Sequence, residues 1–449
     1  MSIIYSARWV VPVSTSPIEN GAVAVQGQRI AGVGPLTEIV GRFRAFRIED
    51  LGEAVILPGL INTHTHLELT AMRGYLENEE PDFFAWLRKL TIARLELLTP
   101  DDIRISALWG ACEAVRAGIT CVGDASDSAL NSMHALREVG MRGVVYQESF
   151  GPDPKLVAEN FAKLASKVGA LRELETELVR AGVSPHAPYT VCGSQLERIA
   201  ELAQRERLPL MMHAAESEAE DLFLREACGP FAEGLEKRSI EWKAPRVSTI
   251  QYLKQVGILA VRPLLAHCIR VDDADVETLR NAGAKVAHCP KSNAKLGHGR
   301  APFAKFIDAG VAVGVGSDSV ASNNTCDILE EARFATLLVR AGGAVVSAQQ
   351  ALEAATLGGA RCFELEREIG ELTQGAQADL AVVSLRGVHQ TPNYDPVATL
   401  VFASSGRDVM LTVIAGREVF RDGRVLTVDE DRLRTRMNEV AKKLQNRAR

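Results

Sequence analysis

The sequence predicts an α/β fold: a (β/α)8 TIM barrel with a small β-sandwich formed by the N- and C-terminal segments. Two patterns carry this prediction. In the middle of the chain, short apolar runs recur, and each is followed by ten or more residues with helical periodicity, as in βα units. At both ends of the chain, short β-rich runs are instead separated by turns that contain glycine.

Eight apolar runs in the middle region are the candidate barrel strands. The range 57–365 has the length of a barrel with insertions. Helical partners with apolar residues at three- and four-residue spacing follow several runs, for example over residues 103–117 and 194–206. The eight runs are residues 55–60, 120–123, 143–146, 182–184, 210–212, 264–266, 285–287 and 311–315.

The two terminal segments, residues 1–56 and 366–449, are each too short to build a good core alone. We therefore expect them to pair into one composite β-sandwich domain, beside a barrel domain over residues 57–365. A charged helix over about residues 429–449 closes the chain. The strand-like runs of the terminal segments are residues 22–25, 29–33, 379–383, 400–402, 410–414 and 418–420.

Composition excludes several classes of protein. The chain has 449 residues, of which 47% are hydrophobic, and a formal net charge of −6. A nucleic-acid-binding protein would show a basic domain or stripe, so we expect a small-molecule substrate and no nucleic-acid partner. No run of 18 apolar residues predicts a membrane span. Eight cysteines without a C-x-x-C pair indicate reduced thiols and a cytoplasmic location. The sequence leaves open whether the chain forms a homo-oligomer.

Histidines and one aspartate fall where predicted barrel strands end. His64 and His66 follow the first strand, and alternate residues of an extended chain share a face. His213, His267 and Asp318 end the fifth, sixth and eighth strands. All of them therefore reach the carboxyl-terminal mouth of the barrel, where barrel enzymes place their active sites. Imidazole ligands favour Zn²⁺ or Fe²⁺ over the hard, oxygen-preferring cations.

Each of these signals has an ordinary explanation when it stands alone. An H-x-H pair occurs by chance, and His213 after an apolar run is typical of a core histidine. Asp318 could open a helix as its N-cap. Packing does not explain why all of them end strands of one barrel, so together they predict a metal site.

Several segments resemble the amidohydrolase superfamily, and within it the branch of purine deaminases and chlorohydrolases. The similarity is greatest to adenosylhomocysteine/methylthioadenosine deaminases and to aminodeoxyfutalosine deaminase, and it covers nearly the whole chain. The segments that carry it are residues 58–66, 184–189, 213–216, 267–268, 288–296, 317–324 and 378–380.

The resemblance implies a mononuclear hydrolase. His64, His66, His213 and Asp318 would hold one divalent transition metal ion, with zinc favoured and iron the alternative. Glu216 matches the general acid/base of the family. Asp318 would also take the proton of the attacking water. His267 would hydrogen-bond that water, although it ligates the metal in some relatives.

The same resemblance assigns substrate contact to His186, with a tight Pro-bounded loop as the alternative explanation. Glu148 after strand three, His288 after strand seven and Ser319 after strand eight are further candidates for binding substrate. Asn323 and Asn324 are equally well explained by helix capping and turn formation. His134, His298 and His389 lack such a context and are expected at the surface.

Two departures from the family pattern bear on the substrate. No lysine ends the fourth strand, where hydantoinase-like members place a bridging carboxylated lysine, so a ring-opening amidase is disfavoured. The glutamate that holds ribose hydroxyls in the related deaminases has no clear counterpart over residues 91–98, because Glu96 falls out of register. Nearby Phe83, Phe84 and Trp86 would offer stacking surfaces or form helix core, and core is the default expectation.

The sequence therefore predicts a metal-dependent hydrolytic deaminase acting on an aminated heterocycle. The substrate favoured by the resemblance is the adenine of a 5′-modified nucleoside of the methylthioadenosine, adenosylhomocysteine or aminodeoxyfutalosine type. A guanine-type deaminase or a chlorotriazine-type hydrolase would use the same metal-and-water chemistry and is the alternative. A non-catalytic assembly protein is disfavoured, because its metal ligands would be eroded.

Overall fold

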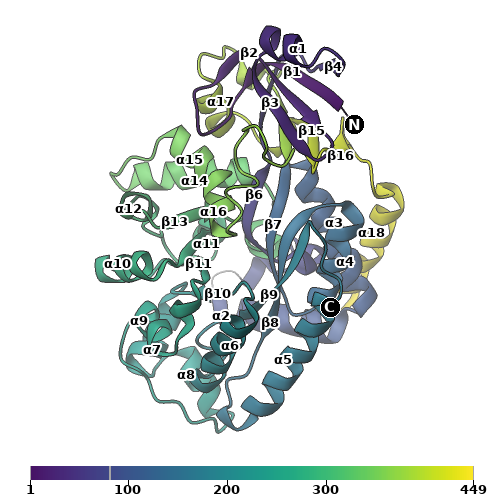
Figure 1. The fold of residues 1–449 in the computed structure, drawn as a ribbon. Coiled ribbons are helices and arrows are strands. Elements are labelled where there is room, and N and C mark those ends of the chain that lie inside the picture. The colour runs from purple at the N-terminus through teal and green to yellow at the C-terminus, as the bar shows by residue number, and fades with distance from the viewer. Residues whose placement is uncertain (1, 80–81, 448–449) are drawn as a thin grey trace.

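The computed structural model describes residues 2–79 and 82–447. Residues 1, 80, 81, 448 and 449 fall within the expected domain ranges but lie outside the described residues. The fold is α/β: parallel strands surrounded by helices lie beneath a β-sheet to which both ends of the chain contribute (Figure 1).

Nine strands from the two ends of the chain form the outer sheet, in the order β17-β16-β15-β14-β5-β1-β2-β3, with β4 also paired to β1. The two ends meet where β14 runs antiparallel to β5. Its strands are β1 Ser2–Val10, β2 Ile18–Gln26, β3 Arg29–Pro35, β4 Arg47–Asp50, β5 Ala54–Pro58, β14 Leu380–Ser384, β15 Val409–Ile414, β16 Arg417–Arg421 and β17 Arg424–Val425.

This topology corrects the expected sandwich. All nine strands are hydrogen-bonded in one continuous sheet rather than in two stacked sheets. Side chains from both chain ends, among them Tyr5, Val23, Leu380 and Leu411, nevertheless bury one another in a single apolar cluster. Neither terminal segment could bury these side chains alone, which is why the two segments pair.

Eight parallel strands form the centre of the molecule, in two four-stranded sheets of order β6-β7-β8-β9 and β10-β11-β12-β13. Isolated parallel bridges join the two sheets at both edges, between Val183 and Leu210 and between Thr65 and Asp318. The strands are β6 Leu60–Thr65, β7 Ile119–Ser126, β8 Arg142–Ser149, β9 Val179–Pro185, β10 Met211–Ala214, β11 Leu264–His267, β12 Lys285–His288 and β13 Ala312–Val315.

Helices alternate with these strands and cover them (Figure 1). Many begin at a side-chain cap, as in α3, where Thr99 and Asp102 form a capping box. The helices are α1 Leu36–Arg42, α2 Phe83–Ile92, α3 Pro100–Arg116, α4 Ala129–Val139, α5 Val157–Arg172, α6 Gly193–Glu206, α7 Glu218–Glu226, α8 Pro230–Glu236, α9 Thr249–Gln255, α10 Asp273–Ala282, α11 Pro290–Lys295, α12 Phe303–Ala309, α13 Val320–Asn323, α14 Ile328–Ala341, α15 Ala348–Ala354, α16 Leu357–Cys362, α17 Pro396–Phe402 and α18 Glu430–Arg447.

Two strands expected from the sequence are wrong: one run lies mostly in a different sheet, and the other forms part of a helix. Residues 55–60 do not form one barrel strand, since β5 ends at Pro58 in the outer sheet and the first central strand, β6, begins at Leu60. An apolar run buried on both faces cannot show to which sheet it belongs. Residues 400–402 are the end of helix α17, because the Asp395 side chain caps its amino end and Pro396 occupies its first turn.

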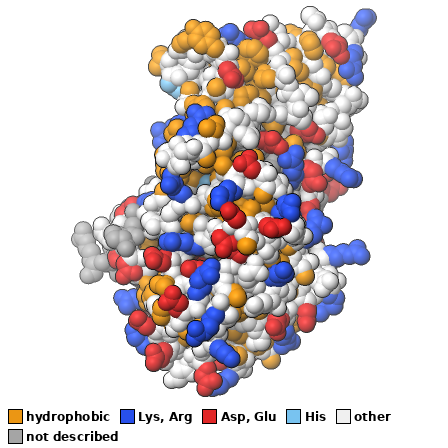
Figure 2. Space-filling view, turned by 90° about the vertical axis from the view of Figure 1, so that its left-hand side faces the viewer, with side chains coloured by type: hydrophobic (Ala, Val, Ile, Leu, Met, Phe, Trp, Pro, Cys, Tyr) orange, Lys and Arg blue, Asp and Glu red, His pale blue; other side chains and the backbone are white. Residues whose placement is uncertain are grey.

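Charged side chains of both signs are interspersed over the face drawn in Figure 2. On that face Lys and Arg do not gather into a continuous stripe. In the described part of the chain, no helix combines the length and the apolar character needed to span a membrane.

A buried ion pair connects the central strands to the outer sheet. Arg142, at the start of β8, donates from Nε and Nη2 to the two carboxylate oxygens of Asp379, at 2.8 and 3.2 Å. Asp379 directly precedes β14, and its Oδ1 also accepts from the backbone N–H of Ala415 at 2.8 Å. The two side chains are only 7% and 2% exposed, so neither charge has water to replace its partner.

We predict that Arg142→Met lowers the free energy of unfolding by about 3 kcal/mol or more, because it leaves a buried carboxylate without its cation. Urea denaturation followed by circular dichroism measures the change. Arg8→Met is the matched control, since it breaks the exposed Arg8–Glu53 pair (2.9 Å) and should cost less than about 1 kcal/mol. Equal losses in the two variants would contradict the structural role of the buried pair.

Candidate active site

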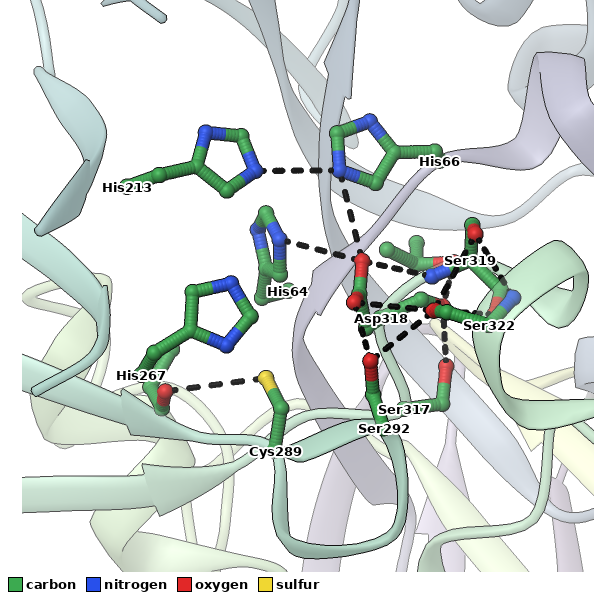
Figure 3. Close-up of polar contacts among 12 residues, drawn as sticks. His64, His66, His213, His267, Cys289, Ser292, Ser317, Asp318, Ser319 and Ser322 are labelled. Carbon is green, nitrogen blue, oxygen red and sulfur yellow. Dashed lines mark hydrogen bonds and ion pairs between the residues drawn. The ribbon is translucent and has the colours of Figure 1, made fainter. Parts of the chain in front are cut away.

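Three imidazoles and one carboxylate meet at the carboxyl ends of the central strands (Figure 3). His64 lies within β6 and His66 directly after it, while His213 lies in β10. The Nε2 atoms of His66 and His213 are 3.2 Å apart. Asp318 Oδ1, beyond β13, lies 3.5 Å from His64 Nε2 and 3.4 Å from His66 Nε2.

Neighbouring groups hold Asp318 and His213 in these orientations. Asp318 Oδ2 accepts hydrogen bonds from Ser292 Oγ at 2.6 Å and Ser322 Oγ at 3.0 Å. Its Oδ1 accepts from the backbone N–H of Ser319 at 2.7 Å. His213 Nδ1 lies 2.9 Å from the backbone carbonyl of His186, so Nδ1 carries the donated proton and Nε2 is left free. Such outer contacts are typical of metal-ligating side chains.

The four side chains fit a divalent transition metal. His64 Nε2 is buried and has no hydrogen-bond partner among the described residues. Burial lowers the pKa of His64 to about 4 and that of His213 well below its ordinary value. Burial alone would raise the pKa of Asp318, but the imidazoles of His64, His267 and His66 outweigh it and keep it well below the usual range. Neutral imidazoles beside an ionised carboxylate suit Zn²⁺ or Fe²⁺.

His267 and Glu216 form the second part of the site. His267 Nε2 lies 3.6 Å from Glu216 Oε1, and its Nδ1 donates to Asn293 Oδ1 at 2.9 Å. Burial would lower the pKa of His267, but the carboxylates of Glu216 and Asp318 raise it above its ordinary value. A carboxylate and an imidazole facing each other beside the imidazole cluster can move protons.

The backbone is strained at the same place. Asp318 has φ 56° and His267 has φ 74°, in the left-handed region that non-glycine residues rarely adopt. Each such residue costs about 1–3 kcal/mol and persists only where the surroundings over-determine it, commonly at functional sites. Strand ends that turn sharply at these residues present the side chains inward instead of continuing the sheet.

Sequence reasoning missed Glu220, which orients the Glu216 loop. The buried Glu220 carboxylate accepts from the backbone N–H groups of Ala215 at 2.8 Å and Glu216 at 3.0 Å, and from Thr249 Oγ1 at 2.8 Å. Burial raises its pKa to about 7. An acidic residue four positions after Glu216 reads as an ordinary residue of the first helical turn, so the sequence offered no signal for this role.

The expected surface position of His298 is wrong. His298 is 6% exposed, its Nε2 lies 3.7 Å from Glu216 Oε1, and its ring meets Phe83 edge to face at 4.5 Å. Helix α11 ends at Lys295, and the turn that follows, residues 297–299, places the His298 ring against Phe83 and near Glu216. Its place in the glycine-rich loop after strand seven was the only signal available from the sequence.

Of the residues expected to bind substrate, some line the cavity and others do not. His186 and Glu148 line the main cavity, and their ligand atoms lie within 4.8 Å of those of His213. Burial raises the pKa of Glu148 well above its usual value, against the opposing effect of Arg94. Ser319 also lines the cavity and caps α13 through Ser322 N–H.

His288 and the two asparagines lie elsewhere. His288 is not among the residues lining this cavity, since it stacks on Phe303 with ring centroids 4.9 Å apart. Asn323 donates to the Ser317 carbonyl and to Glu331, both at 2.6 Å, which is a structural role. Asn324 ends α13 in the left-handed conformation, as the turn explanation requires.

The cavity has a volume of about 700 Å³, which suits a small-molecule ligand. Helix α2 covers part of it. Trp86 is buried, as the core interpretation expects, but Phe84 is 41% exposed and lines the cavity together with Phe83. The core interpretation was therefore wrong for Phe84.

Comparisons with known proteins identify relatives along nearly the whole chain. The model of the Amidohydrolase family matches residues 55–419. A 5-methylthioadenosine/S-adenosylhomocysteine deaminase of Syntrophobacter fumaroxidans is 35% identical over 431 residues, which cover 94% of this chain and 93% of that protein. The protein of the same name from Pelotomaculum thermopropionicum is 32% identical, with 95% of each chain covered.

Solved structures show the same fold. An adenosine deaminase from Xanthomonas campestris with bound zinc superposes with a TM-score of 0.85 at 26% identity, covering 99% of this chain and 98% of that one. An atrazine chlorohydrolase from Arthrobacter aurescens complexed with zinc reaches 0.84 at 22% identity, covering 98% and 100%.

The buried histidines predict how stability depends on pH. Burial lowers the pKa of His288 to about 3, whereas an unfolded histidine titrates near pH 6.5. As the pH drops below about 6.5, the unfolded chain therefore binds one more proton at this histidine than the folded chain does. The free energy of unfolding must fall over this range. We predict that His288→Asn flattens this fall by about 1.4 kcal/mol per pH unit between pH 6 and 5.

Urea denaturation of chelator-treated protein at several pH values measures this slope. His134→Asn, which replaces an exposed histidine, is the control and should leave the slope unchanged. If both variants keep the wild-type slope, His288 does not stay neutral in the folded chain.

Proposed function

Because the chain belongs to the amidohydrolase family, we propose that it is a metal-dependent hydrolytic deaminase that converts an aminated heterocycle and water to the carbonyl compound and ammonia. The observation that carries the proposal is the placement of Glu216 and His267, 3.6 Å apart, beside three imidazoles and Asp318 in one cavity. The substrate we propose is the adenine of a 5′-modified nucleoside, in keeping with the names of the deaminase relatives.

We also propose that the eight parallel strands close into one (β/α)8 barrel, with residues 57–365 as the catalytic domain and residues 1–56 and 366–449 as a composite domain. The two bridges between the four-stranded sheets, at Val183–Leu210 and Thr65–Asp318, support closure. A barrel explains why side chains from β6, β10, β11 and β13 converge, because all its strands end at one mouth.

Four side chains would hold one metal ion, with zinc favoured over iron: those of His64, His66, His213 and Asp318. When bound, the ion supplies a water molecule whose pKa is lowered towards neutrality, and hence a nucleophile at neutral pH. The four side chains need no rearrangement of protonation for this, since the imidazoles are neutral and the carboxylate ionised.

The remaining steps are proton transfers by residues of this chain. Asp318 accepts the proton of the attacking water at its carboxylate. Glu216 donates a proton to the ring nitrogen beside the attacked carbon. The Glu216 carboxylate then takes the remaining proton of the added hydroxyl group and passes it to the amino group, which leaves as ammonia while the carbonyl forms. The proton held by Asp318 returns to Glu216 and completes the cycle. His267 Nε2 hydrogen-bonds the attacking water, while Asn293 fixes its ring through Nδ1.

Four residues are proposed to contact the substrate: His186, Glu148, Ser319 and His288. The first three line the cavity. His288 is stacked on Phe303 and neither residue lines the cavity, so His288 would contact a substrate only after a rearrangement of this region. A cytoplasmic location and the absence of a nucleic-acid substrate belong to the same proposal, and the eight cysteines, none in a disulfide, support the former.

We predict that Glu216→Gln lowers kcat for adenine nucleosides by roughly 10²–10⁴-fold, the usual contribution of a general acid/base. Its zinc content should match that of the wild type, because Glu216 is not a proposed ligand. Ammonia release and the ultraviolet change of the purine measure the rate. Glu218→Gln, two residues away with its side chain 75% exposed, is the control and should keep wild-type activity.

Two outcomes would contradict the proposal. The first is that zinc-loaded wild-type protein releases no ammonia from any adenine nucleoside or free base. The second is that the Glu216→Gln variant stays fully active. Release of chloride from chlorotriazines without any deamination would instead indicate the hydrolase alternative.

A further inference from the structure

His298 has a buried ring nitrogen that the proposed mechanism does not use. The residue is 6% exposed, and its Nε2 has no hydrogen-bond partner among the described residues. Burying a polar atom without a partner lowers stability. The carboxyl group of Glu216 faces this atom, with Oε1 3.7 Å from Nε2. Bringing the two atoms closer by about 0.8 Å would give an N–H···O hydrogen bond of ordinary length.

The backbone fixes the position of His298. Its N–H donates to the carbonyl of Asn293 at 2.9 Å. The side chain of Asn293 also accepts from His267 Nδ1 at 2.9 Å, so one residue anchors both imidazoles. Gly297 and Gly299, on either side of His298, have φ 69° and 110°, in the region that residues with a Cβ rarely adopt. These two glycines permit the turn that carries the buried ring.

Two imidazoles face the same oxygen of Glu216. His267 Nε2 lies 3.6 Å from Oε1, and His298 Nε2 lies 3.7 Å from it. The proposed mechanism assigns His267 Nε2 to the attacking water. The His267 ring also lies beside the rings of His64 and His213, with centroids 5.6 and 5.5 Å away. His298 is therefore the imidazole available to donate to Oε1.

We propose that His298 is a positioning residue of the deaminase: its Nε2–H donates to Glu216 Oε1, so that Oε2 is the oxygen that exchanges protons with the heterocycle. The inference rests on the proposed function and adds the group that orients its general acid/base. His298 is not among the residues lining the cavity, so it acts through Glu216 and not on the substrate.

The electrostatics of this contact place the proton of His298 on Nε2. Burial lowers the pKa of His298, against the attraction of Glu216, so the ring is neutral at neutral pH. A neutral imidazole has one N–H and one lone pair, and its surroundings decide which nitrogen carries the proton. A lone pair on Nε2 would point at an electron-rich oxygen of Glu216, which is repulsive. An N–H at Nε2 is attracted to the same oxygen.

This hydrogen bond strengthens as the reaction proceeds. While Glu216 carries its proton on Oε2, Oε1 is a carbonyl oxygen and accepts from His298. Once Oε2 has given its proton to the ring nitrogen, Oε1 belongs to a carboxylate, and hydrogen bonds to charged acceptors are stronger. A contact that gains strength between the ground state and the transition state raises kcat rather than substrate affinity.

Packing is the competing explanation, because the His298 ring meets Phe83 of α2 edge to face at 4.5 Å. Two substitutions separate the roles. His298→Phe keeps an aromatic ring against Phe83 and removes the donor, whereas His298→Gln removes the ring and keeps an N–H donor at similar reach. With zinc-loaded enzyme and 5′-methylthioadenosine, His298→Phe should lower kcat roughly 10–100-fold and leave KM within about twofold. His298→Gln should retain kcat within about threefold of the wild type.

Controls accompany these two variants. His134→Phe makes the same substitution at an exposed position of α4 and should keep wild-type kcat. Zinc content and urea denaturation are measured for every variant. In a Glu216→Gln background, His298→Phe should cause no further loss of kcat, because a residue that acts through Glu216 has no effect once that carboxyl group is gone.

Four results would overturn the inference. His298→Phe keeps wild-type kcat, His298→Gln loses as much kcat as His298→Phe, the losses from Glu216→Gln and His298→Phe multiply, or His298→Phe loses its zinc. The second result would show that the ring packs and does not donate.

A measurement without turnover distinguishes failure of the inference from failure of the proposed function. Nitrogen NMR of the histidine rings in zinc-loaded wild-type protein, with His298 assigned from its absence in His298→Gln, should show the proton on Nε2 and a shift of that signal in Glu216→Gln. If ammonia is released but Nε2 carries no proton, the inference has failed and the proposed function stands. If Nε2 carries the proton but no heterocycle releases ammonia, the proposed function has failed.

Discussion

Three imidazoles and a carboxylate are packed against one another in a buried space, and the rest of the site is arranged around that contact. The ring nitrogens of His64, His66 and His213 lie within 4.8 Å of one another, and Asp318 Oδ1 lies beside two of them. Without a cation this arrangement leaves polar atoms unpaired, at a cost in stability. The serine hydroxyls on Asp318 and the carbonyl on His213 hold it in place. Its geometry explains why the chain accepts a left-handed backbone at Asp318.

From that contact outward, the cavity divides into two chemically different sides. Phe83 and Phe84 on α2 offer apolar surface, whereas Glu148 and Arg94 form part of a polar wall. A flat, partly apolar heterocycle suits the side formed by Phe83 and Phe84. Glu216 and His267 lie between the metal ligands and this divided space, where proton transfer to a ring nitrogen is required.

Much of this organisation could be predicted from the sequence, because strand-terminal histidines and alternating periodicity are local signals. Seven of the eight expected barrel runs overlap the observed central strands by two residues or more, whereas residues 55–60 share only Leu60 with β6. Local signals fail where tertiary contacts decide. Residues 55–57 are apolar and could be buried in either sheet, so their sequence does not show to which sheet they belong. The buried His298 contacts Phe83, which lies over two hundred positions earlier in the chain, and no local pattern indicates that contact. Glu220 acts through backbone N–H groups, which leave no pattern in the sequence.

X-ray absorption at the zinc edge, on protein loaded with one equivalent of zinc, tests the central claim most directly. The account predicts a nitrogen and oxygen shell at about 2.0–2.1 Å, with the outer-shell signature of three imidazoles, His64, His66 and His213. One imidazole should disappear from the spectrum of His213→Ala. A shell of sulfur, a shell of oxygen alone, or a spectrum unchanged by His213→Ala would contradict it.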